Sequence, residues 1–256
     1  MLIHENFTGG NIVVKSQEEN VIYLDNNLRD TTCEWFYWAF CIEGAEGRTL
    51  TFRFRENRLG YFGPAVSHDL ETWHWLNEKE GDSFCYTFSG QEEKVYFAHD
   101  MLYHPGRFRK FAHRNGVKIK TLTLSQKGRP IPCVEMGDGN RKIVLTARHH
   151  ACESTGSYVL EGVLEELLRE PIEGFGIFCV PFVDYDGVVD GDQGKNRFPH
   201  DHNRDYQPEE KAIYPSVTEI RRYVLEHPVV FGFDFHSPYH CGGVGDKCFI
   251  VQKRKE

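Results

Sequence analysis

The segment LTARHHACESTGSYVLEG, residues 145–162, passes from a strand pattern to a helix pattern within a few residues. It begins within the apolar run RKIVLTAR (141–148), which lacks the alternation of a half-exposed strand. It ends in an amphipathic pattern with apolar side chains at helical spacing. These are Val159, Leu160, Val163, Leu164, Leu167 and Leu168. Two histidines and a glutamate, His149, His150 and Glu153, lie at the junction, which makes them candidates for the chemistry of the protein.

Two further apolar runs end in polar residues in the same way. FGIFCVPFVD (175–184) ends at Asp184, and PVVFGFDFHS (228–237) ends with Asp234, His236 and Ser237. Continuous apolar strands that alternate with amphipathic helices predict an α/β fold, with a mostly parallel or mixed, doubly wound sheet flanked by helices. Ligands of such sheets bind outside the carboxyl ends of the strands, so we expect these polar residues around one crevice.

The first ninety residues follow a different pattern. The runs NIVVKS (11–16), VIYLDN (21–26), CEWFYWAFCIEG (33–44) and RTLTFRFRE (48–56) are rich in β-branched and aromatic residues. Turn residues separate these runs, as they separate the strands of an all-β unit. We expect a small β-sandwich domain over residues 1–93. The polar seam SGQEEK (89–94) divides it from an α/β domain over residues 94–256.

Composition narrows the class of protein. The net charge of −8 argues against non-specific binding to nucleic acid or to anionic membranes. No apolar run reaches the roughly 20 residues of a membrane span, and the start MLIHENFTGGN lacks the pattern of a secretory signal. We therefore expect a cytoplasmic protein. The 8 cysteines are scattered without a CxxC pair, which is typical of reduced thiols.

Three residues have the spacing of a metal site. His150 and Glu153 are three residues apart across the predicted strand-to-helix turn, which brings both side chains to one side. His149 lacks this spacing, because Cys152 follows it at the same interval. His236 adds a third donor from the end of another apolar strand. Two histidines and a glutamate are a common ligand set of catalytic zinc, so the pattern predicts a Zn²⁺ site.

Two other interpretations of the histidines stay open at this stage. Adjacent histidines at a helix start can serve only as caps or surface residues. The stretch FPHDHNR (198–204) offers a rival metal motif in His200 and His202, within a polar loop. Neither alternative uses His236.

The motifs together resemble a known family. LTARHHACESTGSYVLEG, PFVDYDGVVDGD (181–192), DHNRDY (201–206) and FDFHS (233–237) resemble the zinc carboxypeptidase family, that of carboxypeptidase A, and look most like its cytosolic carboxypeptidase branch. The motifs occur in the family's order over nearly the whole chain. CEWFYWAFCIEGAEGRTLTFRF (33–54) also resembles the small β-sandwich that precedes the catalytic domain in that branch. Members of the branch trim C-terminal glutamates, notably from tubulin.

The resemblance implies roles for individual residues. It matches His150, Glu153 and His236 to the zinc ligands of the family. It matches Asp201 to the residue that holds the first zinc histidine in its ligating tautomer. His149 is then a bystander or supports a ligand from behind.

Further matches concern the substrate. Asn203 and Arg204 match the pair that binds the terminal carboxylate, which an amide and a guanidinium can hold with several charge-assisted hydrogen bonds. The family also uses an arginine that stabilises the tetrahedral oxyanion. Within GDQGKNRF (191–198) that residue is Arg197 or, as a second choice, Lys195, because the spacing does not decide between them.

The general base of the family is a glutamate on a strand well beyond the third zinc ligand. This chain ends at Glu256, soon after His236. Glu226, at the end of a predicted helix, and the terminal Glu256 both suit the role poorly. We therefore expect that the general base is not present in this chain and that the α/β domain lacks its C-terminal part.

The leading hypothesis is a zinc metallocarboxypeptidase that hydrolyses the C-terminal peptide bond of a peptide or protein tail and releases glutamate. One alternative is a zinc amidohydrolase of the aspartoacylase or desuccinylase type, which shares the His-x-x-Glu and Asn-Arg motifs. The predicted leading sandwich favours the peptidase, since those deacylases carry their extra domain at the other end. The second alternative is a non-catalytic module that binds zinc or peptide tails, if the chain ends at residue 256.

Overall fold

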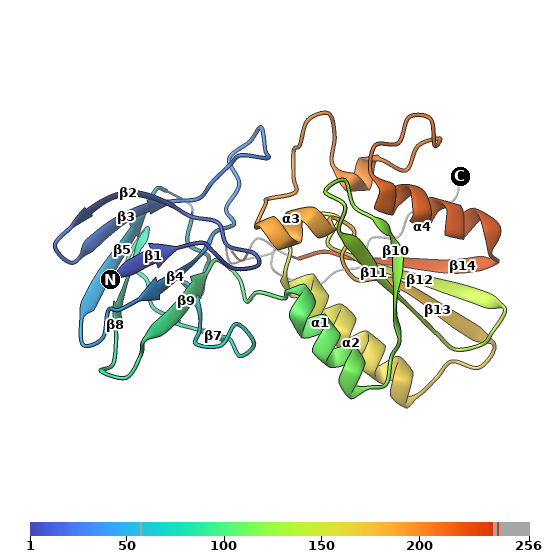
Figure 1. Ribbon diagram of the computed structural model, residues 1–256, viewed down its shortest axis with the longest axis horizontal. Coiled ribbons are helices and arrows are strands. Elements are labelled where there is room, and N and C mark those ends of the chain that lie inside the picture. Colours follow the sequence, from blue (N-terminus) through green and yellow to red (C-terminus); the bar gives the residue numbers. More distant parts are fainter. Residues whose placement is uncertain (57, 238–239, 241–256) are drawn as a thin grey trace.

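The computed structural model describes residues 1–56, 58–237 and 240 (Figure 1). In this part of the chain the strands form three sheets, and helices cover the third one. Two sheets come from the residues up to Ala98, and the third comes from the residues after it. The expected mixed α/β class is therefore confirmed.

The first two sheets are antiparallel apart from one parallel strand pair. One sheet has the order β1 (Leu2–His4), β4 (Ala39–Glu43), β9 (Lys94–Ala98), β6 (Ala65–Ser67) and β7 (His74–Trp75). The other has the order β2 (Val13–Glu18), β3 (Val21–Asp25), β5 (Thr49–Phe54) and β8 (Ser83–Thr87).

Aromatic rings from both sheets fill one shared core. Phe52 of β5 lies 5.3 Å from Phe97 of β9, measured between ring centroids. Trp38, just before β4, stacks on Phe54 of β5 at 4.4 Å. Alternate side chains of each strand point into this core, which is why the sequence there is dense in aromatic and β-branched residues.

The predicted boundary after residue 93 falls immediately before β9. This strand pairs with β4 on one side and β6 on the other, so Lys94–Ala98 lies in the middle of the first sheet. The chain leaves the sheet only after Ala98.

The third sheet is mixed. Its order is β10 (Ile119–Leu124), β11 (Pro130–Met136), β13 (Phe175–Val180), β12 (Arg141–Ala147) and β14 (Val229–Phe235). β13, β12 and β14 run parallel, whereas β10 and β11 pair antiparallel at one end of the sheet. The three parallel strands are the three apolar runs of the sequence.

Helices cover both faces of this sheet (Figure 1). α1 (Pro105–Arg114) and α2 (Thr155–Arg169) pack on one face, and α4 (Pro215–Glu226) packs on the other. The short α3 (Tyr185–Asp190) and the 3-10 helix η1 (His202–Arg204) lie in the connection between β13 and α4. Among the helices of the described residues, none combines the length and apolar character of a membrane span.

The parallel strands end at one edge of the sheet. Ala147 at the end of β12 pairs with Phe235 at the end of β14, and Thr146 pairs with Val180 at the end of β13. The polar residues that follow each strand therefore emerge side by side.

β14 differs from the expectation of a buried strand. Phe231 is 54% exposed and Phe233 is 47% exposed. β14 is the last strand of the sheet in the order described, so its neighbour on one side is β12 and its outer edge has no paired strand among the described residues. An apolar run alone does not reveal whether a strand is central or at an edge.

Leu164→Ala tests the packing of α2 on the sheet. Leu164 is fully buried, so we expect its truncation to lower the free energy of unfolding by about 2–5 kcal/mol. Val159→Ala, on the exposed side of the same helix, should change it by less than about 0.5 kcal/mol. Urea unfolding with an unchanged m-value measures both. Equal effects of the two substitutions would contradict this packing.

Candidate metal centre

A buried arginine shapes the loop between β12 and α2. Arg148 has a φ of 60°, a backbone conformation that residues other than glycine rarely adopt. Its buried guanidinium donates hydrogen bonds to the backbone oxygens of Ala151 and Tyr103, each at 2.9 Å. These bonds hold the turn in the strained conformation that the loop requires.

The first turn of α2 lies directly against the end of β14. Asp100 caps this helix by accepting hydrogen bonds from the backbone nitrogen (3.2 Å) and the hydroxyl (2.6 Å) of Thr155. A Cβ at Gly156 would lie 3.0 Å from the backbone oxygens of Phe235 and His236. Glycine at this position therefore permits the close approach between the two segments.

This approach brings the three predicted ligands together. Glu153 Oε1 lies 3.0 Å from His150 Nδ1, and Glu153 Oε2 lies 2.5 Å from His236 Nδ1. One ligand atom from each residue lies within 4.8 Å of the other two. Glu153 is 3% exposed, so a carboxylate here requires nearby positive charge. The assignment of the three residues as zinc ligands stays a prediction.

The far side of His236 is held by Asp234. Asp234 Oδ2 lies 2.7 Å from His236 Nε2, and its Oδ1 lies 2.8 Å from His149 Nδ1. His149 Nε2 in turn lies 2.8 Å from the Tyr206 hydroxyl. His149 is therefore buried, and it belongs to the series of hydrogen bonds that orients His236. It is not an exposed bystander. Asp234 precedes His236 by two residues in the sequence, but this spacing alone does not reveal the contact.

The ion pairs shift the pKa values of the cluster. Burial opposes ionisation of Glu153, yet hydrogen bonds with His150 and His236 hold the pKa of this carboxyl well below its ordinary value. Burial also disfavours a charged His236, but its bonds to Asp234 and Glu153 outweigh this and raise its pKa to about 10. The site thus favours an ionised carboxylate beside positive charge.

The donor set fits a divalent cation of the zinc type. The two histidines direct Nδ1 toward Glu153, while the other ring nitrogen of each faces an aspartate: Asp234 at 2.7 Å, and Asp201 at 3.8 Å from His150. Metal-binding histidines commonly have such a carboxylate behind the ring. The position of Asp201 suits the role that the resemblance implies.

Lys195 extends into the same cluster. Its Nζ lies 2.7 Å from Glu153 Oε1, and it lies 4.6 Å from the ring centroid of Trp35. The side chain is 21% exposed. A cation already attracted to Glu153 is a further sign that this carboxylate recruits positive charge.

Arg197 does not reach the cluster. Its three guanidinium nitrogens pair with three carboxylates: Asp30 at 2.9 Å, Asp184 at 2.8 Å and Asp192 at 3.0 Å. Each guanidinium nitrogen thus already has a carboxylate partner, which favours a structural role for Arg197. The role of Arg197 toward a substrate or oxyanion stays a prediction, and so does that of Lys195, the second choice from the sequence.

The remaining predicted residues lie in and beside η1. The Asp201 carboxylate accepts a hydrogen bond from the backbone nitrogen of Arg197 at 2.7 Å. Asn203 Oδ1 is buried without a hydrogen-bond partner among the described residues, so this oxygen can still accept a hydrogen bond from a donor. The Arg204 side chain is exposed. Their roles toward a substrate stay predictions.

The two histidines of the rival metal motif, His200 and His202, make other contacts. His200 Nε2 lies 2.6 Å from Asp205 Oδ1. His202 stacks on Tyr214 at 3.6 Å between ring centroids, and burial lowers its pKa well below the ordinary value. Within the described part of the chain, these two histidines form no metal-ligand group.

Glu226 lies far from the cluster. It is exposed at the end of α4, just before β14 begins at Val229, whereas His236 follows the other end of that strand. The expectation that Glu226 is no general base stays a prediction. Glu256 lies outside the described residues.

The chain has relatives among curated proteins, although no family model matches it. It is 27% identical over 256 residues to an uncharacterised protein of Zymomonas mobilis, covering 92% of this chain and 67% of that one. It is 26% identical over 239 residues to cytosolic carboxypeptidase 4 of Mus musculus, covering 85% of this chain. Against cytosolic carboxypeptidase 2 of Xenopus tropicalis it is 29% identical over 139 residues, or 47% of this chain. It spans 19% and 14% of these two carboxypeptidases.

Two solved structures share the fold. The metallo-carboxypeptidase of Burkholderia cenocepacia superposes with a TM-score of 0.76 at 20% identity, covering 93% of this chain and 71% of that one. The metallo-carboxypeptidase of Pseudomonas aeruginosa gives 0.77 at 23% identity, with coverage of 93% and 70%. The expected likeness to the zinc carboxypeptidases, including their cytosolic branch, is confirmed.

His236→Ala should remove one metal ion from the protein. Without this imidazole two ligands remain, and we expect bound zinc to fall by about one equivalent per chain. His113→Ala, an exposed histidine on α1, is the matched control and should change nothing. Elemental analysis after dialysis gives the stoichiometry. Full zinc content in His236→Ala would remove this ligand assignment.

Arg197→Met separates a structural role from a role in substrate binding. Because it leaves Asp30 and Asp184 without their cation, and Asp192 with Arg29 alone, we expect a loss of about 3–5 kcal/mol in the free energy of unfolding. Arg169→Met, which breaks exposed pairs on α2, should cost less than about 1 kcal/mol. Unchanged stability in Arg197→Met, measured by urea unfolding, would contradict the structural role.

Proposed function

We propose that this chain, which is similar to the zinc carboxypeptidases in sequence and fold, acts as a zinc-dependent carboxypeptidase on peptide or protein tails. The observation that carries the proposal is the convergence of His150, Glu153 and His236 at the carboxyl edge of a sheet of this fold. Asn203 and Arg204 follow in a connection of the same sheet, and they offer groups for a terminal carboxylate.

Zinc bound by these three residues would supply a Lewis acid that polarises the scissile carbonyl and lowers the pKa of a bound water. The protein contributes the orientation of the ligands. Asp234 and His149 fix the ring of His236, while Asp201 faces the far side of His150. Arg148 holds the loop between β12 and α2 in its strained conformation.

Lys195 suits the role of stabilising negative charge on the carbonyl oxygen. Its ammonium reaches the carboxylate of Glu153, so it is within reach of a group bound at the same metal. A positioned cation at a developing oxyanion contributes more in a partly buried site than in water. Arg197, fixed by three aspartates, is unsuited to this role.

Carboxylate recognition is assigned to Asn203 and Arg204. The exposed guanidinium of Arg204 can bind a carboxylate with two parallel hydrogen bonds, and the side-chain NH2 group of Asn203 can donate another. The Pseudomonas relative is described in complex with (2-guanidinoethylmercapto)succinic acid, a dicarboxylic acid. We propose that this chain likewise binds a ligand that carries a carboxylate.

Glutamate is our proposed leaving residue, supported by the likeness to the cytosolic carboxypeptidases. The same likeness supports a cytoplasmic location. We assign no general base among the described residues. We also propose that the first two sheets form a β-sandwich domain, with the division after Ala98, because one aromatic core joins them.

The activity is tested with zinc-loaded protein and peptides that end in Glu, Lys or Leu, together with N-acyl amino acids. Mass spectrometry identifies the products, and His236→Ala serves as the control for a contaminating peptidase. Release of the terminal amino acid from peptides, fastest for Glu, is expected. Cleavage of N-acyl amino acids alone would favour the amidohydrolase hypothesis. Binding of peptides without any product would favour the non-catalytic module.

Lys195→Met should reduce kcat by about 100- to 1,000-fold, because the oxyanion loses its charged partner. Zinc content should stay unchanged, since Lys195 is no predicted ligand. Lys127→Met is the matched control, because Lys127 pairs with Asp190 on the exposed surface and should retain wild-type kcat. If Lys195→Met changes only zinc content, then the lysine serves the metal site and not the transition state.

A further inference from the structure

The outer face of the first sheet carries a second group of metal-binding side chains. His4 of β1 pairs directly with Cys41 of β4 in the antiparallel register. Residues that are direct partners point to the same face, as do residues two apart on one strand. Glu43 therefore joins His4 and Cys41 on the face opposite the aromatic core, where Phe40 and Ile42 point inward.

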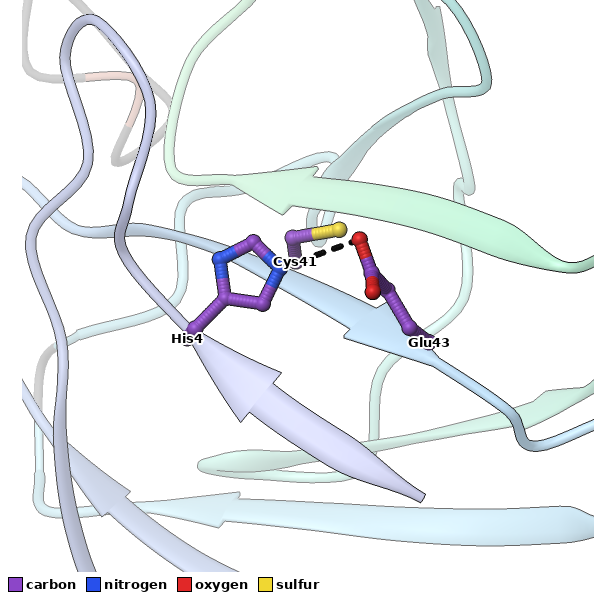
Figure 2. A group of neighbouring side chains, drawn as sticks. All are labelled: His4, Cys41 and Glu43. Atoms are coloured by element: carbon purple, nitrogen blue, oxygen red, sulfur yellow. Dashed lines mark hydrogen bonds and ion pairs between the residues drawn. The ribbon is translucent and has the colours of Figure 1, made fainter.

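The three side chains converge at one place. Figure 2 shows the Cys41 sulfur and the Glu43 carboxylate pointing toward each other, with the His4 ring beside them. His4 Nε2 lies 3.3 Å from Glu43 Oε1, and one ligand atom of each residue lies within 4.8 Å of the others. Two ligand atoms of a tetrahedral zinc ion are separated by about 3.3–3.8 Å, given bond lengths of 2.0–2.3 Å. Small rotamer changes suffice to close the group around one ion.

The surroundings favour a defined site. Cys41 is fully buried, and the His4 side chain is 14% exposed. Phe7 packs edge-on against both the His4 ring and Tyr96, the strand partner of Cys41. A shell of this kind limits access of water to the donors and holds their rotamers.

We propose that His4, Cys41 and Glu43 form a zinc site that is separate from the catalytic centre. Thiolate, imidazole and carboxylate are all ligands that zinc takes, and a thiolate selects against magnesium and calcium. The site joins β1, a three-residue strand at the edge of its sheet, to β4. Its role is to fasten the N-terminal strand. This inference does not rest on the proposed peptidase function.

Two existing contacts oppose metal binding. Lys94 Nζ lies 2.6 Å from Glu43 Oε1 and must move aside, which its 44% exposed side chain permits. His4 Nδ1 accepts a hydrogen bond from the backbone nitrogen of Asn6 at 3.2 Å. Ligation through Nε2 transfers the ring proton to Nδ1 and breaks this bond, and the exposed Asn6 amide can then bond to water. The competition with Lys94 gives the proposal a specific test.

The experiment uses the full chain with His236→Ala, which leaves this site as the remaining zinc site. Zinc content is measured after dialysis, and Co²⁺ is then added as a probe, because a cobalt–thiolate bond gives a near-ultraviolet charge-transfer band. Cys41→Ser and His4→Asn should each abolish the remaining zinc and the band. Cys85→Ser and Cys152→Ser, which alter thiols outside the group, should retain both.

Lys94→Met distinguishes the loss of a zinc ligand from a loss of binding that is caused by misfolding. Removing the competing ammonium should tighten zinc binding several-fold, and an unfolded variant could not produce such a gain. Retention of the cobalt band in Cys41→Ser, or no zinc in the His236→Ala protein, would overturn the proposal. So would a zinc affinity that Lys94→Met leaves unchanged or weakens.

Discussion

The buried carboxylate of Glu153 is the group on which the arrangement of the site depends. At 3% exposure it needs polar partners, and it contacts them from three separate segments: His150 in its own loop, Lys195 in the connection after α3, and His236 after β14. Removing any partner would leave the carboxylate less compensated. The buried negative charge of Glu153, which these segments contact, also suits the site to a divalent cation.

The two halves of the chain are joined by a second set of buried polar contacts. Asp30, from the residues after β3, accepts hydrogen bonds from the backbone nitrogens of Gln193 (3.0 Å) and Gly194 (2.8 Å), and it pairs with Arg197. The Gln193 amide bonds to both backbone groups of Tyr37. The N-terminal sheets therefore support the loop that carries Lys195, which gives them a direct part in shaping the site.

The sequence was most informative where local pattern determines structure. Apolar strands ending in polar residues located His150, Glu153 and His236, because parallel strands bring their carboxyl ends to one edge. It was ambiguous for Lys195 and Arg197, since the choice depends on Asp30, a partner far away in the chain. It also missed how Asp234 connects His149 to His236, and it could not distinguish the edge position of β14 from a central one. Such pairings arise only when distant segments fold together.

The central claim is that the Glu153 cluster binds zinc. The most direct measurement is anomalous diffraction at the zinc absorption edge from crystals of the zinc-loaded protein. We predict an anomalous peak bonded to His150 Nδ1, His236 Nδ1 and the Glu153 carboxylate, with Lys195 displaced from Glu153 Oε1. A fully loaded crystal without a peak at this position, with Lys195 still paired to Glu153, would contradict it.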